Sequence, residues 1–262
     1  QAAFVRGGLA GRLLLPLRAT VLEPARQDEH PVAHGPAPRI GPFVRQNADF
    51  MVRHYVAVAT FSVLIYGALS WIPAHLIREF GLSPAEVGMQ FGPILLVFGG
   101  AGTVAGAALA NALARRGVAQ APIVVTALGM ACAGVLLAQA AWSDTLDAAL
   151  AWYGVGLLCL TLPGGTAIQV VQEAVPNALR GQASALYYLS ISLLGLTFGP
   201  WSVALLTDRV FADPARVGDA LALVAIVVGP SMALLALSTR APFARLTRAQ
   251  QVSGVSASEP VS

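Results

Sequence analysis

The sequence predicts an all-α membrane protein built as a bundle of six transmembrane helices. Every charged residue lies outside six long stretches, which are residues 54–77, 87–114, 117–143, 148–172, 181–207 and 220–239. Each stretch can cross a bilayer as an α-helix, which takes about 20 residues at about 1.5 Å per residue. Composition agrees, because 56% of the residues are hydrophobic and 11% are charged, whereas about 25% of a soluble domain is charged.

The residues before the first stretch predict no further span. Residues 1–22 are half apolar, but Arg6, Arg12 and Arg18 point in three directions on a helix and leave no clean apolar face. Each arginine near mid-bilayer costs roughly 2.5–3.5 kcal/mol. Residues 23–50 contain five prolines and mixed charge, which is typical of a linker. The chain begins at Gln1 rather than Met, which favours the back part of a longer protein.

The arginines set the expected orientation of the bundle, residues 51–240, and of the C-terminal tail, residues 241–262. If the N-terminal segment is cytoplasmic, 13 of the 16 basic residues fall on the cytoplasmic side, and only Arg78, Arg209 and Arg216 fall outside. The positive-inside rule therefore predicts that both termini are cytoplasmic. The pI near 9.2 does not indicate a nucleic-acid partner, because the basic residues lie between apolar runs rather than along one face.

Polar residues inside the spans are candidates for a solute path, because lipid makes them costly unless they face a cavity or a partner. In the first span, Ser62, Tyr66 and Ser70 recur every four residues and share one helix face. In the fourth span, Thr161, Gly165, Gln169 and Gln172 share a face in the same way. Such faces either line a hydrated path or make hydrogen bonds between neighbouring helices. The candidate cavity residues are Ser62, Tyr66, Ser70, Gln90, Thr166, Gln169, Gln172 and Tyr187.

Glycine and proline are frequent within the spans. Two pairs of glycines show the small-xxx-small spacing that lets helix backbones approach closely, namely Gly102 with Gly106 and Gly195 with Gly199. Pro163-Gly164-Gly165 and Gly199-Pro200 are candidate bends, since proline removes a backbone donor and membrane helices break where a cavity or a moving gate lies. Packing alone also explains these residues.

The sequence offers no chemistry typical of an enzyme. It contains no cluster of metal-ligating residues, no Ser/His/Asp set and no Walker-type loop, so we expect neither catalysis nor a bound cofactor or metal. Cys132 and Cys159 lie in the third and fourth spans, where we expect them to pack as apolar residues. No acidic residue lies in the middle of a span, so a group for proton coupling must come from elsewhere.

The segment between the second and third spans resembles a known signature. Residues 106–117 read Gly-Ala-Ala-Leu-Ala-Asn-Ala-Leu-Ala-Arg-Arg-Gly. This is similar to the cytoplasmic motif Gly-x-x-x-Ala-Asp-Arg-x-x-Arg-Arg-Gly of major facilitator superfamily transporters, in which the acid is thought to hold the cytoplasmic gate shut. Asn111 stands in place of that acid and Ala112 in place of the first arginine. Asparagine keeps the hydrogen bond and lacks the charge, so the resemblance implies a weaker lock.

Three other segments resemble spinster-like and anion:cation-symporter members of the same superfamily. Residues 66–88 look like their seventh helix and the loop after it, and residues 175–208 look like their tenth and eleventh helices. Residues 4–26 resemble the end of a sixth helix, so residues 1–22 would be a remnant of that helix and residues 23–50 a cytoplasmic linker. The resemblance implies one half of a major facilitator fold, the C-terminal six-helix half, with the N-terminal six-helix half missing from this chain.

The resemblance further implies alternating access, in which two six-helix bundles rock around a site near mid-membrane. The partners would be a small organic solute, a coupling proton or sodium ion, and the bilayer of a bacterial inner membrane. The residues that match the cytoplasmic gate motifs are Gly106, Asn111, Arg115, Arg116, Gly117, Pro176, Arg180 and Gly181. The alternative is a non-transporting pseudo-transporter or scaffold module that binds a partner, which Asn111 and the missing proton relay favour.

Overall fold

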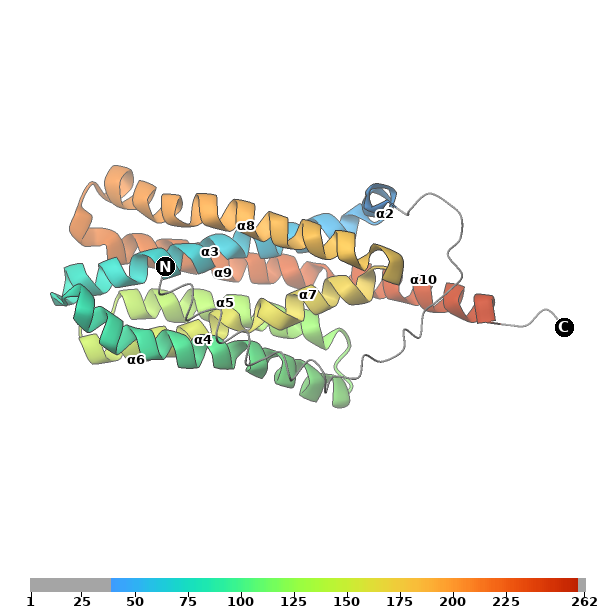
Figure 1. Ribbon diagram of the computed structural model, residues 1–262, viewed down its shortest axis with the longest axis horizontal. Helices are drawn as coiled ribbons and strands as arrows, with labels where there is room; N and C mark the ends of the chain where they lie inside the picture. The colour runs from blue at the N-terminus through green and yellow to red at the C-terminus, as the bar shows by residue number, and fades with distance from the viewer. Residues whose placement is uncertain (1–38, 259–262) are drawn as a thin grey trace, which may run out of the picture. The chain divides into compact units, whose positions relative to one another are not determined.

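The computed structural model describes residues 39–258, and this part of the chain is almost entirely helical (Figure 1). The helices are α2 (Ile40–Gln46), α3 (Ala48–Phe80), α4 (Pro84–Arg115), α5 (Ala121–Ala141), α6 (Leu146–Thr161), α7 (Pro163–Ala174), α8 (Arg180–Leu205), α9 (Val217–Ser238) and α10 (Arg240–Ser258). Short 3-10 turns cover Asn177–Leu179 and Pro214–Arg216, and a π-helical turn covers Leu206–Phe211. The expected sixth-helix remnant, residues 1–22, and most of the linker lie outside the described residues.

Within residues 39–258, six helical segments are long and apolar enough to cross a membrane, which confirms the predicted fold class. Their bounds are Ala48–Phe80, Pro84–Arg115, Ala121–Ala141, Leu146–Ala174, Asn177–Phe211 and Pro214–Ala249. Each overlaps one of the six uncharged stretches of the sequence. The helices exceed the uncharged stretches because charged residues continue the helical backbone at the membrane–water boundary, where they are tolerated.

Local signals at the second span show why the chain turns where it does. The first span, α3, ends at Gly81, whose φ of 67° suits the left-handed termination of a helix. Ser83 then caps α4 in a capping box with Glu86, whose carboxylate accepts a hydrogen bond from the Ser83 N–H at 2.8 Å. Pro84 occupies the first turn, where a missing N–H costs nothing. Short connections of this kind make consecutive spans antiparallel.

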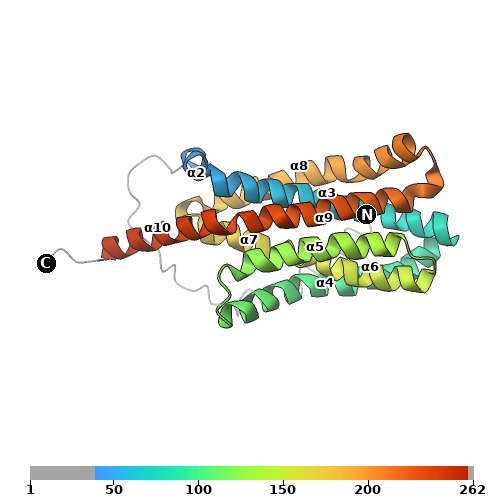
Figure 2. The ribbon, with the colours of Figure 1, turned by 180° about the vertical axis from the view of Figure 1, so that it is seen from behind.

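The six spans pack as a series of neighbours whose two end helices, α8 and α4, both also contact α7. Along the series, α8 packs on α3, α3 on α9, α9 on α5, α5 on α6, and α6 on α4. Figures 1 and 2 show this order from opposite sides, with α8, α3 and α9 on one side of the bundle and α5, α6 and α4 on the other. The two helices at the ends of the series are the most open, since 17% of the most apolar stretch of α4 and of α8 is buried, against 61% for α3 and α5.

Glycines set the close approach of α3 and α8. A side chain at Gly199 would overlap the backbone of Gly67, and one at Gly195 would overlap the ring of Tyr66. Ser62 uses this proximity, because its hydroxyl donates across the interface to the Ile191 carbonyl at 3.0 Å. The helices α5 and α9 meet in the same way at a glycine pair that the sequence analysis does not single out, Gly134 and Gly229.

The fourth span is broken into α6 and α7 at Leu162, immediately before Pro163. Proline has no N–H for the Cys159 carbonyl, which instead accepts a hydrogen bond from the Leu162 N–H at 3.3 Å. The second span packs against this break, because a side chain at Gly106 would meet the Leu162 carbonyl. At the other candidate bend, in the fifth span, α8 continues as one helix through Gly199 and Pro200 and becomes irregular only at Leu206–Phe211.

Candidate functional site

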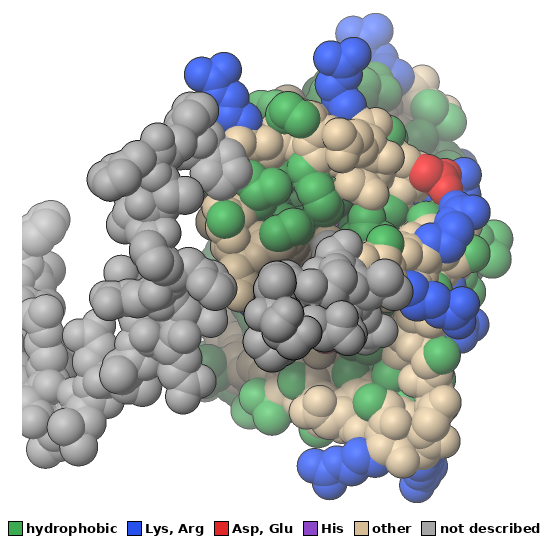
Figure 3. Space-filling view, turned by 90° about the vertical axis from the view of Figure 1, so that its right-hand side faces the viewer, with side chains coloured by type: hydrophobic (Ala, Val, Ile, Leu, Met, Phe, Trp, Pro, Cys, Tyr) green, Lys and Arg blue, Asp and Glu red, His purple; other side chains and the backbone are tan. Residues whose placement is uncertain are grey.

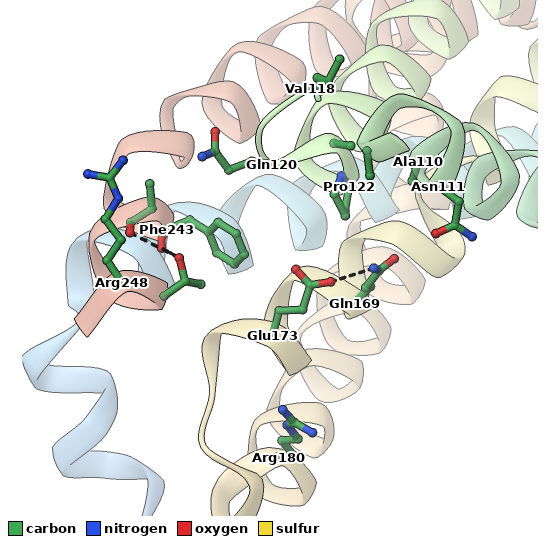
Figure 4. Close-up of a pocket in the computed structure, with 14 residues that line it drawn as sticks. Ala110, Asn111, Val118, Gln120, Pro122, Gln169, Glu173, Arg180, Phe243 and Arg248 are labelled. Carbon is green, nitrogen blue, oxygen red and sulfur yellow. Dashed lines mark hydrogen bonds between the residues drawn. The ribbon is translucent and has the colours of Figure 1, made fainter. Parts of the chain in front are cut away.

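A cavity among the described residues lies at the end of the bundle where α4 ends and α5 begins, which we call the basic end. Its volume is about 690 Å³. Side chains from α4, α5, α7, α8 and α10 converge on it (Figure 4). The lining residues are Ala110, Asn111, Ala114, Val118, Gln120, Ala121, Pro122, Gln169, Glu173, Arg180, Phe243, Ala244, Thr247 and Arg248.

The basic end carries a marked excess of arginine. Figure 3, which looks onto this end, shows basic side chains spread around the face and few acidic ones. Arg115 and Arg116 are exposed at the C-terminus of α4, where a positive charge interacts favourably with the helix dipole. Arg180 and Arg248 contribute directly to the cavity wall. An anion entering the cavity therefore meets a favourable field.

The loop between α4 and α5 forms one rim of the cavity and is held from the other end of the chain. Gly117 and Gln120 both adopt left-handed backbone angles, with φ of 80° and 52°. Arg240, the first residue of α10, donates from Nε to the Gln120 side-chain oxygen at 3.3 Å and from Nη2 to the Ala119 carbonyl at 3.2 Å. The α9–α10 junction thus fixes the loop between α4 and α5.

The α7 wall presents a paired amide and carboxylate to the cavity. Gln169 and Glu173 are one turn apart, and the Gln169 amide donates to the Glu173 carboxylate at 2.7 Å. An acid in the last turn of a helix is disfavoured by the helix dipole, so this hydrogen bond offsets an unfavourable position. Arg180 follows on the next helix, where its Nε donates to the Val175 carbonyl at 3.2 Å and closes the end of α7.

Another wall of the cavity comes from α10, most of which was expected to be a cytoplasmic C-terminal tail, residues 241–262. Phe243 and Leu246 are buried, and the Phe243 ring lies 5.6 Å from the ring of Phe50 on α3. Arg245 adds an ion pair with Asp49 at 3.0 Å, although both side chains are largely exposed. Apolar packing is therefore the main anchor of α10, because exposed ion pairs contribute only about 0–1 kcal/mol.

Two of the predicted cavity residues do not face a cavity in the described part of the chain. Ser62 is fully buried between α3 and α8, where it bonds the Ala59 and Ile191 carbonyls. Thr166 is also buried, and its hydroxyl is hydrogen-bonded to that of Thr126 on α5 at 2.9 Å. For these two positions the structure shows the interhelical hydrogen bonds that the sequence left as the alternative.

The remaining predicted cavity residues are placed differently. Ser70, Gln90 and Gln172 are exposed on their helices, and Gln169 lies in the cavity wall. Tyr66 is half-buried against Gly195. Tyr187 is buried, with its ring edge-on to those of Tyr55 and Tyr188 at 6.1 and 5.2 Å.

The predicted gate residues divide into three groups. Asn111 and Arg180 line the cavity at the basic end. Gly106 is a packing residue against the α6–α7 break, and Gly117 supplies a left-handed turn. Arg115, Arg116, Pro176 and Gly181 are exposed and lie outside the cavity wall.

Several cavity residues were not predicted from the sequence. These residues include Gln120, Phe243, Thr247 and Arg248. Gln120 lies outside the two loop motifs that supplied the gate candidates, and the other three follow the last uncharged stretch. The spacing of Phe243 and Leu246, three residues apart among polar neighbours, was an available signal for an amphipathic helix.

Comparisons with known proteins agree with this architecture. The sequence profile of the Major Facilitator Superfamily matches residues 2–200. The chain belongs to this superfamily. Its six apolar helices and this membership make it an integral membrane protein. No protein of curated function matches the chain.

Solved structures of this superfamily share the fold. One similar structure is a bacterial homolog of the human lysosomal transporter Spinster in an inward-facing, unoccupied conformation, with a TM-score of 0.59, 18% identity, and coverage of 94% of this chain and 58% of that one. The same homolog in an inward-facing, occupied conformation gives a TM-score of 0.55, 16% identity, and coverage of 76% and 49%. This chain thus spans about half the length of those proteins and fits one six-helix half of their fold.

Proposed function

We propose that this chain is the C-terminal half of a secondary-active transporter that moves a small organic solute by alternating access. Membership of the Major Facilitator Superfamily supports transport rather than catalysis. The coverage of about half of the similar structures supports a missing partner bundle, which would be the N-terminal six-helix half. The arginine excess at the basic end supports a cytoplasmic location for that end and for both termini, in a bacterial inner membrane.

The observation that carries this proposal is the exposure of polar side chains within membrane-spanning helices. Ser70, Gln90 and Gln172 are exposed although each lies inside a span. Lipid contact would leave two amides without hydrogen-bond partners, which is costly in hydrocarbon. A hydrated path shared with a second bundle removes that cost.

The open faces of α4 and α8 supply the surface against which the second bundle would pack. On α4, Leu96 and Val104 are 78% and 72% exposed, and on α8, Leu193 and Leu196 are 60% and 59% exposed. These helices end the series of packed neighbours, so an N-terminal half placed between them would cover both. The basic-end cavity would then be the cytoplasmic mouth of the path, with Asn111 and Arg180 at its gate and a proton or sodium ion as the coupling ion.

The test is solute uptake by the full-length gene product in liposomes. Gln169→Ala removes a cavity amide and leaves Glu173 without its partner, so we expect uptake to fall at least fivefold with unchanged insertion. Gln46→Ala is the matched control, because Gln46 is exposed on α2 and lies outside both the six spans and the cavity wall. Equal uptake by both variants would remove Gln169 from the path.

A scaffold function is the second candidate, because Asn111 lacks the charge of the family's gate acid. It predicts that the full-length protein inserts and folds but moves no solute from a broad panel of organic anions, sugars and lipid-like molecules. Uptake of any one solute, abolished by an excess of that solute on the same side, would exclude it.

A further inference from the structure

The two cysteines of the chain meet at the interface of α5 and α6. Cys132 is half-buried on α5, and Cys159 is buried on α6 with 9% of its surface exposed. Both thiol groups are free, and the two side chains interact with each other. They were expected only to pack as apolar residues, and the proposed transport path uses neither.

Two glycines explain why these thiols are neighbours. A side chain at Gly129, one turn before Cys132, would lie 2.9 Å from the Cys159 carbonyl oxygen. A side chain at Gly156, one turn before Cys159, would lie 2.8 Å from the Leu137 side chain. The antiparallel backbones therefore approach closely on both sides of the pair, and this register places position 132 opposite position 159.

The thiol pair lies at the edge of an apolar strip that faces outward from the bundle. Leu128 and Val135 share a helix face with Cys132 and are 45% and 49% exposed. Trp152 and Val155 share a face with Cys159 and are 40% and 43% exposed. The second bundle proposed above covers α4 and α8, which leaves this strip on α5 and α6 to contact lipid. A reagent would then reach these sulfurs from the hydrocarbon rather than from water.

We propose that Cys132 and Cys159 form a lipid-facing dithiol site that binds trivalent organoarsenicals through both sulfurs. Thiolate sulfur is a soft ligand that selects soft partners. In the reaction with RAs=O, each thiol gives up its proton, two As–S bonds form, and the oxygen leaves as one molecule of water. Arsenic stays trivalent, so no oxidant or reductant is needed. The adduct links α5 to α6 one turn before the break at Leu162.

The test uses phenylarsine oxide, an apolar organoarsenical, and the chain in lipid nanodiscs. Intact mass should show one adduct per chain with both thiols consumed, and dimercaptopropanol should reverse it. We expect half-saturation at a concentration roughly 100-fold lower than in Cys132→Ser or Cys159→Ser, because the second As–S bond is intramolecular. Cys132→Ala and Cys159→Ala replace any serine variant that does not elute as a single folded species.

Two controls make the proposal falsifiable. Combining Cys132→Ser with Leu128→Cys keeps two thiols on the same helix faces but moves one of them by a helical turn. This double variant should bind phenylarsine oxide as weakly as the single variants do. Native-like affinity in this variant would overturn the pairing of Cys132 with Cys159. A carboxylate-bearing phenylarsine oxide should react at least tenfold more slowly than the apolar reagent, and equal rates would overturn access from lipid. Absence of an adduct in the native chain would overturn the site itself.

Discussion

Replacing Gly199 with alanine tests the closest contact between α3 and α8. An added Cβ would lie 2.8 Å from the backbone nitrogen of Gly67 and 2.9 Å from both the Tyr66 Cβ and the Val63 carbonyl oxygen. These neighbours are backbone atoms or a Cβ, so none can rotate away. The two helices must separate by roughly half an ångström to restore normal contact distances.

The expected cost follows from two opposing effects. Overpacking of a tight interface costs about 1–3 kcal/mol, and the same separation stretches the hydrogen bond from Ser62 to the Ile191 carbonyl, now 3.0 Å, which contributes about 0.5–1.5 kcal/mol. Alanine regains about 1 kcal/mol of helix propensity over glycine. We therefore expect a net destabilisation of about 0.5–3.5 kcal/mol, a factor of about 2–400 in the folding equilibrium.

The matched control is Gly100→Ala, because Gly100 also lies within a span and no atom lies within 4 Å of its added Cβ. Only the propensity gain acts there, so this variant should be as stable as the native chain or slightly more stable. Both variants are unfolded reversibly with sodium dodecyl sulfate in mixed micelles and followed by tryptophan fluorescence. If Gly199→Ala is as stable as Gly100→Ala, the α3–α8 contact is looser than described and the argument fails.

Two further predictions concern the basic end. Asn111→Asp places a carboxylate in a cavity that Arg180 also lines. We therefore expect the closed form of this end to be stabilised by about 1 kcal/mol, which raises its population relative to the open form roughly fivefold. An engineered cysteine in the cavity wall should then be labelled more slowly, and an unchanged labelling rate would mean that the gate does not use this position. Phe243→Ala should raise the rate of backbone amide hydrogen exchange in α10 far more than Arg245→Ala does. The reason is that truncating a buried aromatic side chain costs about 3–5 kcal/mol, whereas an exposed ion pair contributes at most about 1 kcal/mol. A larger effect of Arg245→Ala would show that charge holds the helix in place.

The six spans could be predicted from the sequence because hydrocarbon imposes a single strong requirement. A spanning helix must exclude charge over about 20 residues, and no soluble core demands this so uniformly. Residues 54–77 and 87–114 accordingly lie inside α3 and α4. The ends were less predictable, because Arg53 and Arg115 continue the helices past the uncharged stretches and propensity alone does not stop a helix at the lipid boundary.

The faces of the spans were harder to assign than their extents. Helical periodicity places Ser62, Tyr66 and Ser70 on one stripe, but it cannot say whether that stripe meets water or another helix. In the structure these three residues differ in burial along α3, since Ser62 is buried, Tyr66 is half-buried and Ser70 is exposed. The decisive information is the glycine pairing of α3 with α8, which involves positions more than 100 residues apart.

The arginines illustrate the same limit at the basic end. A count of positive charges weighs every arginine alike, so it sets an orientation without distinguishing a topological charge from a structural one. The structure makes that distinction: Arg115 and Arg116 are exposed at a helix terminus, whereas Arg180 closes the end of α7 and Arg240 holds the α4–α5 loop. Arg180 and Arg240 each donate a hydrogen bond to a backbone carbonyl. Replacing either with lysine would keep the number of positive charges but lose the directed geometry of the guanidinium. The residues that build the cavity rim are therefore defined by their hydrogen bonds rather than by their charge.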